Sequence, residues 1–133
     1  MAGKKLSQHV PDIQKALDKA FAEHIVVTQG KLASSNPVDT GRMASSWFIG
    51  KDTPDRSVAP ERDEPGGVDV PQYSGRIEYD GTWYISNNLP YAERVAYDPK
   101  WAKGGAGGAA WFTSIVGQMT ADLNKRMERY LPK

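Results

Sequence analysis

The sequence predicts an α+β fold with a long N-terminal helix, a small antiparallel sheet with a hairpin, and a C-terminal amphipathic helix. Apolar residues recur at three- and four-residue steps near both ends of the chain, which indicates two amphipathic helices. Between them, strand-forming residues flank the pair Asp80-Gly81, a strong signal for a tight turn. At 133 residues, the chain is expected to form a single domain, residues 1–133.

The composition narrows the classes of function. The absence of cysteine excludes disulfides and thiolate chemistry, and it fits a reducing compartment. No apolar run approaches the ~20 residues that span a membrane, and Lys4 and Lys5 are not followed by the apolar part of a secretory signal. The net charge of +1 does not indicate a nucleic-acid binder, although residues 51–69 are acidic and residues 101–133 basic on balance.

The first helix is expected over residues 11–33, with Pro11 in its first turn, where a missing N–H costs little. Its length would be about 34 Å at 1.5 Å per residue. A helix that long is expected either to project or pack against a neighbouring subunit, or to pack on the sheet as a core helix. Its apolar stripe comprises Val10, Ile13, Leu17, Ala20, Phe21, Ile25, Thr28 and Leu32.

Residues 36–50 are expected to turn the chain from this helix into a strand. Pro37 disfavours the α conformation at the residue before it and so ends the helix. Asp39 and Thr40 can bond nearby backbone N–H groups, and Gly41 permits a left-handed backbone or a close approach. A strand is expected over residues 45–49. The next segment, residues 51–72, has four prolines and no periodicity, which predicts a flexible loop insertion that could order on contact with a partner.

Residues 76–87 are predicted to form a hairpin. With a two-residue turn, Glu78 would face Trp83 and Ile77 would face Tyr84. Both faces of this hairpin would carry apolar groups, so we expect helices to cover one face and consider a second chain for the other.

After the hairpin, Pro90 is expected to open a short helix, and a Gly-rich hinge, residues 102–108, to precede the last helix. The hinge lacks the Gly-Lys-Ser/Thr of a phosphate-binding loop. Lys125, Arg126 and Arg129 complement the dipole of the last helix at its C-terminal end. The apolar stripe of that helix comprises Phe112, Ile115, Val116, Met119, Leu123, Met127 and Tyr130.

Three chemical alternatives were weighed. Asp39-Thr40-Gly41 is the catalytic triplet of aspartic proteases, but no apolar strand precedes it and the large Arg42 follows it. His9 and His24 have no carboxylate at metal-ligand spacing, so we expect them to be solvated. A nucleic-acid-binding accessory module could use a basic C-terminal region with an aromatic residue, comprising Trp101, Lys103, Arg126 and Arg129.

Two motifs point elsewhere. The first is Val38-Asp39-Thr40-Gly41-Arg42-Met43 followed by Ser46-Trp47, and the second is Asn88-Leu89-Pro90-Tyr91-Ala92 followed by Val95 and Tyr97. Their order, with the long helix before them, resembles the tail-completion and head–tail joining (neck) proteins of tailed bacteriophages and covers roughly residues 10–98. The chain departs from that pattern at Ala96-Tyr97-Asp98, where a family-like ending is Glu, aromatic, Gly, and in the loop of residues 51–72.

The resemblance implies a non-enzymatic virion structural protein of the phage neck or tail, without cofactor, metal or catalytic residues. It would be assembled in the cytoplasm of a bacterial host as a hexameric or other homo-oligomeric ring around the DNA channel. Its expected partners are further copies of itself and neck, portal-adaptor, tail-terminator or tail-tube proteins, with DNA passing through the lumen without sequence readout and no membrane involved.

The same resemblance gives structural or interface roles to seven residues. Asp39 and Thr40 would fix the turn, Gly41 would let chains pass closely, and Arg42 would pair with a carboxylate. Trp47 and Tyr91 would anchor either the subunit core or a contact between subunits. The full set is Asp39, Thr40, Gly41, Arg42, Trp47, Asn88 and Tyr91.

Overall fold

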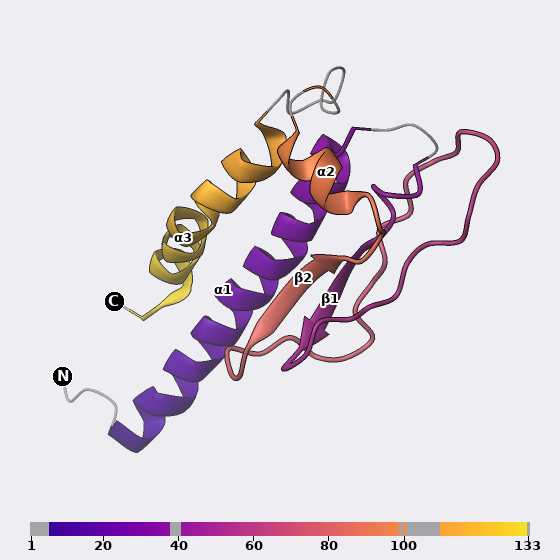
Figure 1. Ribbon diagram of the computed structural model, residues 1–133. Helices are drawn as coiled ribbons and strands as arrows, with labels where there is room; N and C mark the ends of the chain where they lie inside the picture. Colours follow the sequence, from indigo (N-terminus) through magenta and orange to yellow (C-terminus); the bar gives the residue numbers. More distant parts are fainter. Residues whose placement is uncertain (1–5, 38–40, 99, 101–109, 133) are drawn as a thin grey trace.

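The computed structural model describes residues 6–37, 41–98, 100 and 110–132. In chain order it contains α1 (Leu6–Ser35), β1 (Trp47–Lys51), β2 (Trp83–Asn87), α2 (Ala92–Tyr97) and α3 (Trp111–Tyr130). α3 runs back along α1, the two strands lie on another side of α1, and α2 sits at the end of the molecule where α1 finishes (Figure 1). The predicted α+β class, with a long first helix, an antiparallel sheet and a C-terminal helix, is confirmed.

α1 is both a core helix and a projecting one. From Ala16 to Ala33 it buries small and branched side chains against the rest of the molecule, with Ala20 wholly inaccessible. Its first turns extend past the end of α3 (Figure 1), and there Val10 and Ile13 are 56% and 39% exposed. The helix begins at Leu6, before the residue 11 expected from the sequence, so Pro11 lies inside it. The helix therefore packs in the core over most of its length and projects at its first turns, while contact with a neighbouring subunit stays a prediction.

The sheet joins strands that are far apart in the chain. β1 and β2 pair antiparallel, with Trp47 opposite Asn87 and Lys51 opposite Trp83. One step beyond the strands, the N–H of Asp52 donates to the carbonyl of Thr82 at 2.6 Å, and the N–H of Thr82 is 3.3 Å from the Asp52 carboxylate. Both backbone groups of Thr82 are therefore directed at β1.

The predicted hairpin of residues 76–87 is wrong, although its second half is β2. A two-residue turn at Asp80-Gly81 would make Thr82 exchange hydrogen bonds with Tyr79, because the residues flanking such a turn form a bonded pair. In the structure, however, both the N–H and the carbonyl of Thr82 form hydrogen bonds with Asp52. The N–H of Tyr79 donates instead to the Asp18 carboxylate of α1 at 2.8 Å, so Tyr79 lies beside the helix, and residues 76–79 are not part of the sheet.

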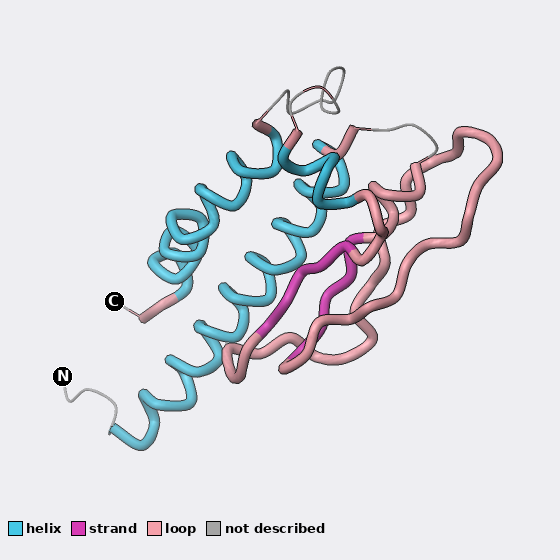
Figure 2. Tube along the Cα trace, in the orientation of Figure 1, coloured by secondary structure: helices cyan, strands magenta, loops and turns pink. Residues whose placement is uncertain are grey.

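The two faces of the sheet have different covers. Trp47 and Ile49 of β1 point toward the helices and are buried. On the other face, the hydroxyl of Ser86 donates to the carbonyl of Asp55, and the backbone of residues 53–55 passes so close to Gly50 that a Cβ there would lie 2.5 Å from the Thr53 oxygen. Figure 2 shows the long loop after β1 on the side of the sheet away from α1 and α3. The second face is thus covered in part by the chain's own loop.

Candidate functional site

The two motifs that carry the phage resemblance meet in one core. The side-chain amide of Asn87 donates to the carbonyl of Met43 at 2.8 Å, which ties the end of β2 to the turn before β1. Leu89 and Val95 from the second motif pack in the same cluster as Met43 and Trp47 from the first. The buried cluster comprises Leu32, Ala33, Met43, Trp47, Leu89, Ala92, Val95, Ala96, Trp111 and Ile115.

Trp47 lies at the centre of this cluster. Its side chain is 4% exposed, and its indole N–H donates to the Asn36 side-chain oxygen at 3.0 Å. Its ring stacks on Phe112, with centroids 5.9 Å apart, and meets Trp111 edge-on at 6.1 Å. Of the two positions considered for Trp47, subunit core or subunit contact, the structure places it in the core.

Gly41 and Arg42 hold the neighbouring loop. Gly41 has φ +89°, a conformation that favours glycine, and a Cβ there would lie 2.7 Å from the Arg62 guanidinium and 3.0 Å from the Gly66 oxygen. Arg42 donates through Nε to the carbonyl of Ala59 at 2.9 Å and lies 3.9 Å from the Glu61 carboxylate. Asp39 and Thr40 lie outside the described residues, so their expected roles stay predictions.

Three buried polar side chains, to which the sequence analysis assigned no role, fasten the long loop as well. The hydroxyl of Ser46 accepts the N–H of Ala59 at 2.9 Å, and that of Ser45 accepts the N–H of Asp69 at 2.9 Å. The amide of Gln29, from α1, donates both to the carbonyl of Trp47 at 2.8 Å and to that of Pro71 at 2.7 Å. The loop of residues 51–72 has no helix or strand beyond Lys51, as expected, but it is fastened to the body at defined points.

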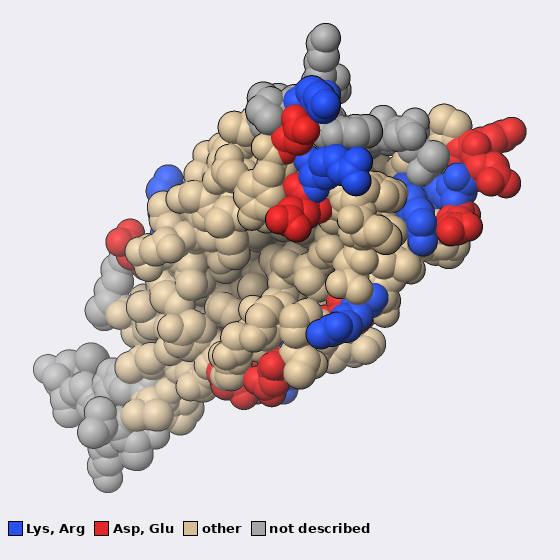
Figure 3. All heavy atoms as spheres, in the orientation of Figure 1, with Lys and Arg blue, Asp and Glu red and all other residues tan. Residues whose placement is uncertain are grey.

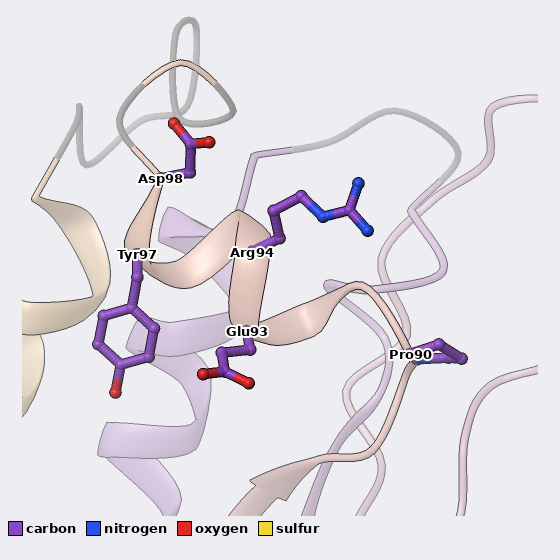
Figure 4. A pocket seen from close by; sticks show the side chains of 5 residues that line it. All are labelled: Pro90, Glu93, Arg94, Tyr97 and Asp98. Carbon is purple, nitrogen blue, oxygen red and sulfur yellow. The ribbon is translucent and has the colours of Figure 1, made fainter.

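Asn88 and Tyr91 lie at the surface. The Asn88 amide reaches the carbonyl of Arg56 at 3.5 Å, and the Tyr91 side chain is 37% exposed while its carbonyl accepts the N–H of Val95. Next to them is a shallow depression along α2. In Figure 4 its side chains diverge, with Tyr97 and Glu93 on one side and Asp98 and Arg94 pointing elsewhere, so they do not converge on one substrate. The depression is lined by Pro90, Glu93, Arg94, Tyr97 and Asp98.

A polar network joins α1 to α3. Nδ1 of His24 lies 2.8 Å from the Asp122 carboxylate, and the His24 residue is only 4% exposed, so the expectation that His24 is solvated is wrong. Its partner stands 98 residues away in sequence, which no local spacing rule detects. Arg126 donates to Asp122 at 3.0 Å and to Glu23 at 3.2 Å, and the Tyr130 hydroxyl donates to Glu23 at 2.7 Å.

This network shifts the ionisation of its carboxyl groups. Burial raises the pKa of Asp122, but the hydrogen bonds from Arg126 and His24 outweigh it and hold that pKa below its usual range. The Tyr130 hydroxyl, together with Arg126, lowers the pKa of Glu23 in the same way. The Asp122 carboxylate raises the pKa of the Arg126 guanidinium. The arrangement favours the charged forms, as in a structural ion-pair network.

None of the chemical alternatives gains a site among the described residues. Gly41 of the protease triplet follows the end of α1 and not a strand. The part of the chain that the structure describes contains no group of three His, Cys, Asp or Glu side chains that could hold a metal ion. Arg126 is engaged with two carboxylates, and Trp101 and Lys103 lie outside the described residues. On the face seen in Figure 3, Lys and Arg alternate with Asp and Glu and form no continuous basic stripe. No described helix is long and apolar enough to cross a membrane.

Comparison with known proteins identifies no relative of this chain. No protein-family model, no curated protein and no solved structure matches the chain.

Proposed function

We propose that this chain is a structural protein of the neck or tail of a tailed bacteriophage, which completes the tail end and joins it to the head. It would act as a ring of identical subunits around the DNA channel, in the virion, after assembly in the cytoplasm of the bacterial host. Its neighbours would be neck, portal-adaptor, tail-terminator or tail-tube proteins. No step of this role requires a cofactor or catalytic residue.

The observation that carries the proposal is the convergence of the two motifs. Asn87 bonds to Met43, and Leu89, Val95, Met43 and Trp47 share one cluster, so the residues behind the resemblance act together as a scaffold. The surface around α2 exposes 37% of Tyr91, the residue just before that helix, and 60% of Tyr97 at its end, and exposed tyrosines are enriched in protein interfaces.

Native mass spectrometry of the purified protein, followed by negative-stain imaging of large species, tests the proposal. A cyclic oligomer with a central hole wide enough for duplex DNA is the expected result. If only monomers form, the expected location is the virion, and the protein should then be detected in purified phage particles. A stable dimer that cleaves peptides, with the cleavage lost in Asp39→Asn, would instead establish the protease interpretation.

A matched pair of variants separates folding from assembly. Trp47→Ala should lose the fold, because it empties the centre of the buried cluster. Tyr91→Ala should keep the circular dichroism spectrum of the wild type and lose oligomers or particle incorporation, because its side chain is exposed. Assembly of Tyr91→Ala at the wild-type level would remove α2 from the proposed interface.

A further inference from the structure

The register of the sheet leaves one edge of β2 open. In an antiparallel pair, residues that bond to the partner alternate with residues whose N–H and C=O point away from it. Because Asp52 and Thr82 are a bonded pair in the same register, Gly50–Tyr84 and Phe48–Ser86 are bonded pairs as well. The remaining residues of β1, including Trp47, should then direct their backbone groups away from β2. The carbonyl of Trp47 does so, because it accepts a hydrogen bond from the Gln29 amide.

By the same alternation, the N–H and C=O groups of Trp83, Ile85 and Asn87 point away from β1. Among the described residues, no hydrogen bond uses these groups. Natural proteins usually guard such an edge with a charged residue, a proline or a bulge. β2 reads Trp-Tyr-Ile-Ser-Asn and has none of these. Figure 1 shows this edge on the side of β2 away from β1, and the surface on this face is hollowed between the sheet and α3 (Figure 3).

A second open edge lies in the long loop. The carbonyl of Gly67 accepts from Arg62, the N–H of Asp69 donates to Ser45, and the carbonyl of Pro71 accepts from Gln29. Alternate residues are therefore bonded on one side, which is the two-residue period of an extended chain. In an extended chain of this period, the backbone groups of Val68 and Val70 point to the other side. Among the described residues no hydrogen bond to these groups is found, and both side chains are 40% exposed.

These two edges lie on opposite sides of one sheet. Gln29 donates to both Trp47 and Pro71, and Ser45, two residues before β1, accepts from Asp69. Residues 69–71 therefore lie beside the outer edge of β1, whereas the open edge of β2 faces the other way. Two different surfaces on one chain make a head-to-tail contact, which repeats from subunit to subunit and closes into a ring when the rotation allows. The occupant that the chain itself supplies for the β2 edge is thus residues 67–71 of a second copy.

We propose that residues 67–71 of one subunit add to β2 of the next as an antiparallel strand, so that the sheet continues across the subunit boundary. In an antiparallel pair, residues that exchange backbone hydrogen bonds lie directly opposite each other. Val68 and Val70 would therefore lie beside the apolar side chains Trp83 and Ile85 of the next subunit. Asp69 then falls on the opposite face, across from Tyr84 or Ser86. This inference rests on the ring proposed above for its setting, and it names one contact between neighbouring subunits of that ring.

Engineered cysteines test the contact directly, because the chain has none of its own. Asp69→Cys protein is mixed with Tyr84→Cys or Ser86→Cys protein and oxidised. Non-bonded antiparallel neighbours have Cα atoms about 4.5 Å apart, within the range of a disulfide. The expected product is the mixed dimer of Asp69→Cys with one of the two partners. The matched control, Val70→Cys mixed with Tyr84→Cys, should not cross-link, since these side chains lie on opposite faces.

Each outcome decides the question. Homodimers of Asp69→Cys, or no cross-link in any mixture, would overturn the strand addition. A ring seen by imaging without the 69–84 or 69–86 cross-link would overturn this inference and leave the proposed function standing. The cross-link in open filaments that never close would support this inference and count against the ring.

A backbone variant gives a second readout. Val70→Pro removes one outward N–H from the segment without touching the bonds of Asp69 or Pro71, and it should weaken self-association about tenfold. Val70→Thr keeps both the N–H and the β-branched shape and should associate like the wild type. Equal association of the proline and threonine variants, measured by sedimentation velocity, would contradict the contact.

Discussion

The two ends of α3 are held to α1 by different kinds of contact. At its first turns, Trp111 and Ile115 enter the buried cluster, with Trp111 only 1% exposed. At its last turns, the contact consists of Asp122, Arg126 and Tyr130 against His24 and Glu23. Apolar burial depends little on pH, whereas a network of ionised groups depends on it strongly. The attachment of α3 to α1 is thus insensitive to pH at one end of α3 and dependent on pH at the other.

The largest effect is expected at the apolar end. Trp111→Ala should lower the free energy of unfolding by about 3–5 kcal/mol, because it removes a fully buried ring and leaves a cavity beside Trp47. Urea unfolding followed by circular dichroism measures the change. Trp111→Phe, which retains much of the volume, should lose clearly less, and an equally large loss would mean that the indole hydrogen bond to Val95, at 3.3 Å, matters more than packing.

A smaller loss is expected at the polar end. Asp122→Ala leaves His24 buried without its partner and deprives Arg126 of one carboxylate, which should cost about 1–3 kcal/mol. The double variant Asp122→Ala with His24→Phe should recover part of this loss, because no unpaired polar group is then buried. Additive losses in the double variant would show that the two residues do not act as a pair.

Acid should weaken the polar end first. The pKa values of Asp122 and Glu23 are lowered in the folded protein, so these groups contribute stability above their unfolded pKa values of about 4, and that stability is lost as the pH falls through the folded values. We expect the thermal midpoint to fall between about pH 5 and pH 2. In Asp122→Asn with Glu23→Gln the slope should be shallower, and an unchanged slope would place the acid sensitivity elsewhere.

The sequence was informative where structure is local. Three- and four-residue periodicity located both long helices, and the strand expected over residues 45–49 and the second half of the hairpin expected over residues 76–87 correspond to β1 and β2. The pairing itself was missed. Asp80-Gly81 is a local hairpin signal, but β2 pairs with β1, and Thr82 bonds to Asp52, thirty residues away in sequence. A two-residue period cannot report which edge of a strand is used.

The candidate site shows the same limit. Gly41, Arg42 and Trp47 were singled out from the motif, and the structure gives each a defined contact. Ser45, Ser46 and Gln29 were assigned no role, although they hold the long loop, because a serine or glutamine in a helix or turn carries no sign of a distant backbone partner. His24 was misjudged for the same reason, since burial against Asp122 depends on how α3 packs.

The smallest effect tests how far the polar end extends. Lys19 lies 4.5 Å from the centre of the Tyr130 ring, a cation–π contact at the rim of the network. Lys19→Ala should lower the free energy of unfolding by about 0.5–1 kcal/mol, the usual value for an exposed contact of this kind. Lys19→Met keeps the aliphatic stem and removes the charge, so it separates cation–π attraction from packing. If both variants lose the same amount, charge accounts for the contact, and the polar end of α3 begins at Lys19. If Lys19→Met is as stable as the wild type, the stem alone packs on Tyr130, and the charge network ends at Glu23.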